Sequence, residues 1–279
     1  MDNLYILTEE RAKPNVVKKI LEIYSNEYNK QLKVNNRLKI IPDINSNEIF
    51  NSEYIIENAK ISGIDNIILK IASGNSSFVD FLVFEQSSAP KECSINNEND
   101  GNNLKLLIEE TKTSDKESRN TGVYQRMSKF VYADYFYPNT PKIMLYNITN
   151  PDDDKRPSNT SIFGTNMLLT QNVKIIGKSL EYFDKFKTID ELIEYKNSMR
   201  RPPQGNIPII ITKEKDSIKI SGRLSKPANE GNIGHDPNIG ALTAISKTLR
   251  KLGWDKDIII THHGVKQEYV NNSKSNKFF

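Results

Sequence analysis

The amino-acid sequence predicts an α/β fold in which an N-terminal core carries a C-terminal α+β extension. In residues 1–150, strand-like apolar runs alternate with apolar residues at helical spacing. A polar stretch over residues 150–159 follows, and the segment beyond it combines a hairpin pattern with helix patterns. At 279 residues, with 37% hydrophobic and 27% charged residues, the chain suits a soluble globular protein rather than a disordered one.

Two helices are predicted in residues 1–150. The first covers residues 9–29, where apolar residues recur at helical spacing and Pro14 sits in the first turn. The second begins at Asn120 or Thr121, either of which can cap it, and runs to Phe136. Extended segments are predicted over residues 37–41, 53–61, 66–71, 77–84, 104–112 and 141–147.

Residues 151–279 are predicted to form the extension, which packs on the core and contributes to DNA binding. The capping box from Thr188 to Glu191 opens a helix that ends near Met199. Residues 207–212 and 217–222 form a hairpin, a further helix runs from 236 to 253, and residues 257–262 form a last strand.

Charge and cysteine content narrow the class of protein. The net charge is +4, with −2 in residues 1–150 and +6 in residues 151–279, so the second part can neutralise phosphates. Cys93 is the single cysteine, which excludes an internal disulfide and fits a reducing compartment. The start of the chain lacks the pattern of a signal peptide, and no apolar run is long enough for a membrane span, so we expect a cytoplasmic protein.

Two of the strand-like runs carry the residues that suggest chemistry. Asp80 lies in the run 77–84, and the run 104–112 ends in Glu110-Thr-Lys112. Side chains alternate along a strand, so Glu110 and Lys112 project from one side and Glu109 from the other. If the two runs pair, two carboxylates and one amine converge, which suits a divalent cation and hydrolysis of a phosphodiester. The other interpretation is a solvated strand edge with a surface ion pair.

This arrangement resembles the PD-(D/E)XK nuclease superfamily, and within it the type II restriction endonucleases, over residues 14–147. The resemblance implies a mixed-sheet core of helix, three strands, helix and strand. It also implies that Asp80 and Glu110 bind the metal and that Lys112 activates the attacking water. Val79 stands where the family has a proline, and the long polar insert over residues 86–103 is expected to form an extended hairpin loop.

The resemblance also implies a function and partners. We expect Mg²⁺-dependent, sequence-specific cleavage of double-stranded DNA by a homodimer in the bacterial cytoplasm, with a cognate DNA methyltransferase in the same system. Two alternatives stay open. One is a repair or junction-resolving nuclease of the same superfamily, and the other is a non-catalytic DNA-binding or scaffold protein.

Further residues are candidates for metal or DNA contacts. In the family, a glutamate of the first helix often supports the metal, and Glu22 is the preferred residue here. The loop after Lys112 and the helix that follows it are expected to approach DNA, or else to form a polar outer face. The predicted DNA-binding residues are Arg119, Asn120, Gln125, Arg126 and Lys129. Arg119 and Arg126 are the favoured base readers, because a guanidinium matches the acceptors of guanine, and Arg200, Arg201 and Arg223 are the alternatives.

Overall fold

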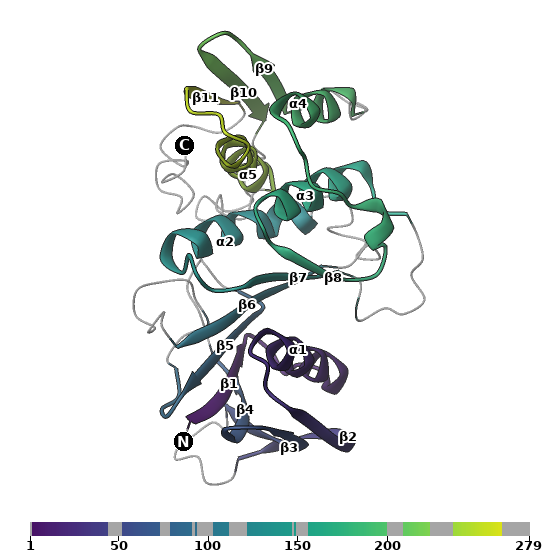
Figure 1. Ribbon diagram of the computed structural model, residues 1–279, viewed down its shortest axis with the longest axis vertical. Coiled ribbons are helices and arrows are strands. Elements are labelled where there is room, and N and C mark those ends of the chain that lie inside the picture. The colour runs from purple at the N-terminus through teal and green to yellow at the C-terminus, as the bar shows by residue number, and fades with distance from the viewer. Residues whose placement is uncertain are drawn as a thin grey trace. The chain divides into compact units, whose positions relative to one another are not determined.

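The computed structural model of the protein is drawn in Figure 1. It describes residues 2–43, 52–72, 79–90, 93, 103–111, 122–146, 148, 156–199, 209–223 and 237–263. Contacts divide the chain into two compact units. The first unit is Met1–Glu110 with Ala133–Ile143, and the second is Thr111–Tyr132 with Met144–Phe279. The division into a catalytic core and an extension at residue 150 stays a prediction.

The described part is a mixed α/β fold with five α-helices and two sheets. The helices are α1 (Pro14–Glu27), α2 (Gly122–Phe136), α3 (Asn159–Thr170), α4 (Ile189–Ser198) and α5 (Pro237–Lys251), with a short 3₁₀ helix η1 (Leu180–Tyr182). The strands are β1 (Asp2–Thr8), β2 (Leu32–Pro42), β3 (Glu53–Ile61), β4 (Ile64–Ile71), β5 (Phe81–Gln86), β6 (Leu104–Thr111), β7 (Lys142–Tyr146), β8 (Lys174–Gly177), β9 (Ile210–Lys213), β10 (Ser217–Arg223) and β11 (Asp257–His263). No helix in these ranges is both long and apolar enough to cross a bilayer.

The larger sheet is mixed, as expected, and has the strand order β2-β3-β4-β1-β5-β6-β7-β8. β1 lies near its centre, parallel to β4 and antiparallel to β5. The sequence patterns did not predict β1. Its residues from Leu4 to Thr8 are all buried, so they lack the apolar–polar alternation that marks a half-exposed strand.

β5 and β6 form an antiparallel pair in which Phe81 lies opposite Ile108. Four side chains at the centre of the pair are fully buried, those of Leu82, Val83, Leu106 and Leu107. The predicted run 77–84 starts too early, because β5 begins at Phe81 and Asp80 lies in the bend before it. Residues 73–78, and most of the insert over 86–103, lie outside the described residues.

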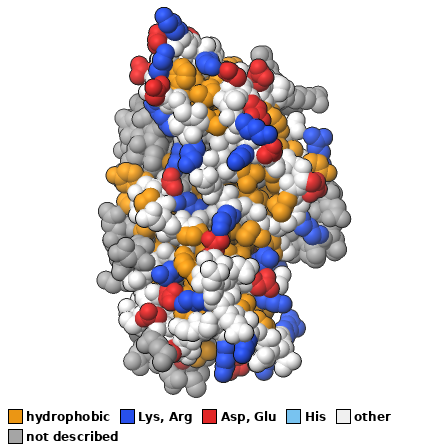
Figure 2. Space-filling model, viewed as in Figure 1, with side chains coloured by type: hydrophobic (Ala, Val, Ile, Leu, Met, Phe, Trp, Pro, Cys, Tyr) orange, Lys and Arg blue, Asp and Glu red, His pale blue; other side chains and the backbone are white. Residues whose placement is uncertain are grey.

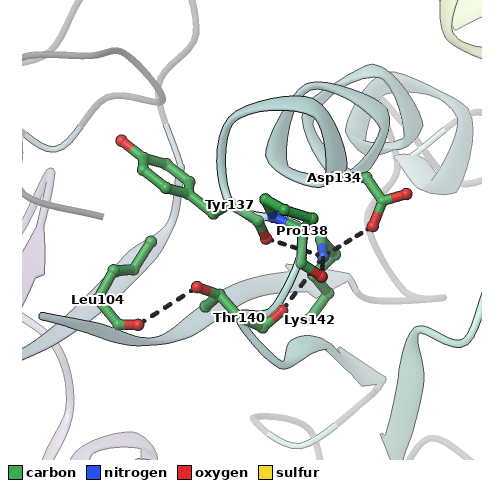
Figure 3. A network of polar contacts seen from close by, with 6 residues as sticks. All are labelled: Leu104, Asp134, Tyr137, Pro138, Thr140 and Lys142. Atoms are coloured by element: carbon green, nitrogen blue, oxygen red, sulfur yellow. Dashed lines mark hydrogen bonds and ion pairs between the residues drawn. The ribbon is translucent and has the colours of Figure 1, made fainter. Parts of the chain in front are cut away.

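A buried lysine joins the end of α2 to the start of β7 (Figure 3). Lys142 Nζ donates to the carbonyl oxygens of Tyr137 (3.2 Å), Pro138 (3.3 Å) and Thr140 (3.2 Å). It also forms an ion pair with Asp134 at 2.8 Å. The Thr140 hydroxyl donates to a carbonyl oxygen at the start of β6. The turn between α2 and β7 is therefore tied to the β5–β6 pair by polar contacts.

Within the second unit, α3 is a helix that the sequence analysis missed. Nine of its twelve residues are buried, among them Ser161, Thr165 and Asn166. A helix that is buried on every side has no polar face and hence no amphipathic period to detect. Ser158 caps it by accepting a hydrogen bond from the backbone N–H of Ser161 at 3.2 Å.

The predicted helices and hairpin of the C-terminal segment are confirmed. Thr188 caps α4 through a hydrogen bond from the Glu191 backbone N–H at 3.1 Å. β9 and β10 are antiparallel, and β10 is parallel to β11, with α5 as the connection between these two strands. The three-stranded sheet therefore contains a βαβ unit.

Two glycines set how closely helices of the second unit approach α2. A Cβ atom built on Gly240 of α5 would lie 2.0 Å from the carbonyl oxygen of Tyr124. A Cβ atom on Gly164 of α3 would lie 2.7 Å from Met127 Cε and 2.9 Å from Val123 Cγ1. The contact of Gly240 is with rigid backbone, whereas both contacts of Gly164 are with side chains.

We expect Gly240→Ala to lower the free energy of unfolding by about 2 kcal/mol or more, because overpacking against backbone cannot be relieved by a change of rotamer. Gly164→Ala is the matched comparison, and its cost should be smaller, since the atoms that oppose it belong to the side chains of Met127 and Val123 and not to the backbone. Urea denaturation of the two variants and the wild type measures both values. Equal stability of the two variants would contradict the close approach at Gly240.

Candidate functional site

Three carboxylate residues meet where β5 begins and β6 ends. The backbone N–H of Glu110 donates to Asp80 Oδ2 at 2.7 Å. The backbone N–H of Asp80 donates to Glu109 Oε1 at 3.2 Å. Asp80 and Glu110 are therefore adjacent through the Glu110 backbone, and the Asp80 backbone contacts the Glu109 carboxylate. The convergence of the Asp80 and Glu110 carboxylates on one cation stays a prediction.

The sequence analysis did not include Glu109 among the site residues. The pairing of Phe81 with Ile108 puts Asp80 next to Glu109 on the neighbouring strand, one position beyond that pair. Glu109 is fully buried, whereas Glu110 is half-buried. The alternation of side chains correctly separates Glu109 from Glu110, but it cannot reveal which of them faces Asp80. Only the register between the strands does so, and the long insert hides that register.

The residue before Asp80 is held by Cys93. Val79 N–H donates to the carbonyl oxygen of Cys93 at 3.4 Å, and Cys93 Sγ donates to the carbonyl oxygen of Val79 at 3.2 Å. Both residues are fully buried. Proline has no backbone N–H and could not make the first contact. Valine at this position therefore keeps a hydrogen bond that positions the chain at Asp80.

Glu22, the predicted third metal ligand, lies on α1 and is engaged along that helix. Its carboxylate forms ion pairs with Lys18 at 3.9 Å and with Lys19 at 3.5 Å. In the described ranges, no group of three or more Asp, Glu, His or Cys residues is arranged to hold a metal ion. The role of Glu22 as a ligand stays a prediction.

Three predicted site residues, Lys112, Arg119 and Asn120, lie outside the described residues, as do Arg200 and Arg201 among the alternative base readers.

Gln125, Arg126 and Lys129 lie on α2 and are half-buried. Gln125 and Lys129 are one turn apart on this helix, as predicted. Arg126 Nη1 donates to the carbonyl oxygen of Gly122 at 2.9 Å, so part of its guanidinium is bound along its own helix. A contact between any of these residues and DNA stays a prediction.

A partly buried polar cluster links α1 to β5 in the first unit. Glu85 accepts hydrogen bonds from Tyr24 Oη (2.5 Å) and from Lys30 Nζ (2.5 Å). Burial alone would raise the pKa of Glu85, but the hydrogen bonds from Lys30 and Tyr24 and the charges of Lys30 and Lys105 outweigh it, so this pKa lies below its ordinary value. Burial, reinforced by the Glu85 carboxylate, raises the pKa of Tyr24. The cluster therefore favours a charged Glu85 and a neutral tyrosine.

Lys196 of α4 is a second unusual titratable group, in the second unit. Only 7% of the residue is exposed, and burial lowers its pKa to about 8. Its ammonium lies 5.9 Å from the ring centroid of Phe163, which stacks on Tyr195. Lysine stems commonly cover aromatic surface in this way, so the observed contacts assign Lys196 a packing role.

Comparison with known proteins returned no match to a family model, to a curated protein or to a solved structure. The chemistry of the site therefore rests on its own residues. Carboxylate oxygens at the end of a buried strand pair can hold a hard divalent cation, and such a cation can stabilise charge on a phosphate.

We expect Glu85→Gln to lower the free energy of unfolding at pH 7 by about 2 kcal/mol, because the carboxylate charge that pairs with Lys30 is lost. The pKa of Glu85 is lower in the folded protein than its ordinary value of 4.5, so its stabilisation is present above pH 4.5. That stabilisation disappears as the pH falls through the folded-state pKa.

The difference in stability between wild type and variant should therefore shrink below pH 4.5. Urea titrations at several pH values measure it, with the exposed Glu57→Gln as the control. A difference that stays constant down to pH 3 would rule out the ionic role of Glu85.

Proposed function

We propose that this protein is a Mg²⁺-dependent endonuclease of double-stranded DNA, of the type II restriction endonuclease kind, built on a PD-(D/E)XK core. The observation that carries the proposal is the hydrogen bond of 2.7 Å between the Glu110 backbone and the Asp80 carboxylate. It brings two acidic residues together at the end of a buried, antiparallel strand pair. Carboxylates are costly to bury, which favours a functional role for this group.

The donor set suits Mg²⁺. This ion usually takes one or two protein carboxylates and completes its shell with waters and substrate phosphates, so Asp80 and Glu110 suffice without a dedicated cage of protein ligands. The absence of a larger ligand group in the described ranges is compatible with that mode. When bound, Mg²⁺ would supply a Lewis acid that stabilises charge on the phosphate and on the leaving oxygen.

The chain's own residues are assigned separate tasks. Asp80 and Glu110 bind and orient the cation through their carboxylates. Lys112, two residues beyond Glu110 on the same side of the strand pattern, holds the attacking water and helps to remove its proton. Glu109 accepts the Asp80 N–H and so fixes the backbone that carries the first ligand.

The same proposal covers recognition and partners. A homodimer on a palindromic site, with Arg119 and Arg126 as base readers and a cognate methyltransferase that protects host DNA, follows from the family resemblance. The net charge of +6 in residues 151–279 supports additional phosphate contacts from that segment.

We expect at least a ~100-fold reduction of Mg²⁺-dependent cleavage in each of three variants, Asp80→Asn, Glu110→Gln and Lys112→Ala. Each of them removes a charged group that binds the cation or activates the attacking water. The exposed Glu57→Gln on β3 is the control and should retain wild-type cleavage. Single-turnover assays on unmethylated DNA measure the loss. Near-wild-type cleavage by any folded member of the three overturns the role of that residue.

Sequencing the fragment ends separates the proposal from its alternatives. Ends that share one short sequence support a restriction enzyme. Ends scattered over the substrate, or confined to branched DNA, favour a repair or junction-resolving nuclease. Binding without cleavage at any Mg²⁺ concentration favours a DNA-binding scaffold.

Glu109 and Glu110 are expected to behave differently. Glu109→Gln keeps an acceptor for the Asp80 N–H, so cleavage should fall by less than ~10-fold, whereas Glu110→Gln removes a charged ligand and should require far more Mg²⁺. Mg²⁺ titrations of the cleavage rate compare the two. If Glu109→Gln is the variant that loses cleavage while Glu110→Gln keeps it, the second metal ligand is Glu109.

A further inference from the structure

A cavity of about 490 Å³ lies between the start of α1 and β2, within the first unit. We call it the α1–β2 basic pocket. Its lining contains the cationic side chains of Lys13, Lys18 and Arg37 and the amides of Asn15 and Asn36. Two apolar residues complete the lining, and no carboxylate is among the described residues that form it. Three of the seven described lining residues are cationic and two carry amides, which suits an anionic ligand.

A bulge in β2 presents part of this lining. β2 and β3 pair regularly up to Val34 and again from Lys39, and the residues between them leave the ladder. Asn36 has a left-handed φ of 64°, which asparagine adopts more readily than most residues. Asn58 of β3 closes the bulge by donating from Nδ2 to the carbonyl oxygen of Arg37 at 2.9 Å. Bulges commonly redirect side chains at functional positions.

The cations of the pocket are largely uncompensated. Lys13 and Arg37 are exposed and have no ion-pair partner in the described part of the chain, and Lys18 has only a long contact of 3.9 Å to Glu22. Residues 11–42 contain eight lysines and arginines against two glutamates. In the lower part of Figure 2, where Figure 1 draws α1 and β2, Lys and Arg side chains lie on the surface together with some Asp and Glu side chains.

We infer that the α1–β2 basic pocket binds the phosphate backbone of duplex DNA, an inference that rests on the proposed function. Lys13 and Arg37 neutralise phosphates and displace counterions, and the amides of Asn15 and Asn36 donate to phosphate oxygens. These contacts carry no sequence information. They hold the duplex in register, so that the scissile phosphate can reach Asp80 and Glu110.

The test is the binding of a duplex of about 20 base pairs, with EDTA present, over a series of salt concentrations. Lys13→Ala/Arg37→Ala is expected to weaken binding at least ~10-fold at low salt and to reduce the slope of log affinity against log salt by about two. The control is Lys33→Ala/Lys60→Ala. It removes the same charge from two exposed residues that are cross-strand partners on β2 and β3, outside the pocket. The control should lose less than ~3-fold.

A third variant, Lys13→Arg/Arg37→Lys, keeps the charge and should bind within ~3-fold of the wild type. Equal losses of duplex affinity in the pocket variant and the control variant would contradict binding at the α1–β2 basic pocket, because they indicate a general effect of net charge. Absence of salt-dependent duplex binding by the wild type overturns it as well.

Cleavage with Mg²⁺ is measured separately, so the two proposals can fail independently. A protein that cleaves DNA, but whose pocket variant binds like the control, keeps the nuclease function and loses the pocket. A protein that does not cleave, but whose pocket variant alone loses duplex binding, keeps the pocket and loses the nuclease function.

Discussion

The hydrogen bonds that tie Asp80 to Glu109 and Glu110 are the constraint on which the candidate site depends. They close the end of the β5–β6 pair, whose central side chains are fully buried. Glu109 is itself fully buried, so its carboxylate needs donors within the protein, and the Asp80 N–H is one of them. Cys93 is hydrogen-bonded to Val79, and the end of β6 is hydrogen-bonded to Asp80, so two neighbouring residues of this segment are held. Such support is what a ligand needs if it is to keep its geometry when a charged substrate arrives.

Sequence patterns predict elements well where one side is polar. The capping box at Thr188 and the helical spacing in α1 are local signals, and both helices form, although α1 begins at Pro14 and not at residue 9 as predicted. β1 and α3 were missed for the opposite reason. Both are buried on nearly all sides, and an apolar run without alternation has no period that distinguishes strand from helix. Fully buried elements are therefore harder to predict from sequence than half-exposed ones.

The residues of the candidate site were likewise predicted in part from the sequence and missed in part. Asp80 and Glu110 were expected together from the strand-like runs that carry them, and the structure joins them by a hydrogen bond from the Glu110 backbone to the Asp80 carboxylate. Glu109 was missed, because its relation to Asp80 depends on a register set by residues far apart in sequence. The basic pocket was hidden as well. Averaging charge over residues 1–150 gives a small negative value and conceals the excess of lysine and arginine in residues 11–42, of which the fold places Lys13, Lys18 and Arg37 around one cavity.

The buried amine of Lys142, whose hydrogen-bond donors all have partners, has a consequence for chemical labelling. Reagents that acylate amines need access to the nitrogen, and Nζ of Lys142 is buried, forms an ion pair with Asp134 and donates to three carbonyl oxygens. In the native protein this lysine resists modification, whereas exposed lysines such as Lys33 react. Acylation of Lys142, located by mass spectrometry, would therefore report that the junction between α2 and β7 has opened. The same amine that stabilises the turn thus serves as an internal reporter of its integrity.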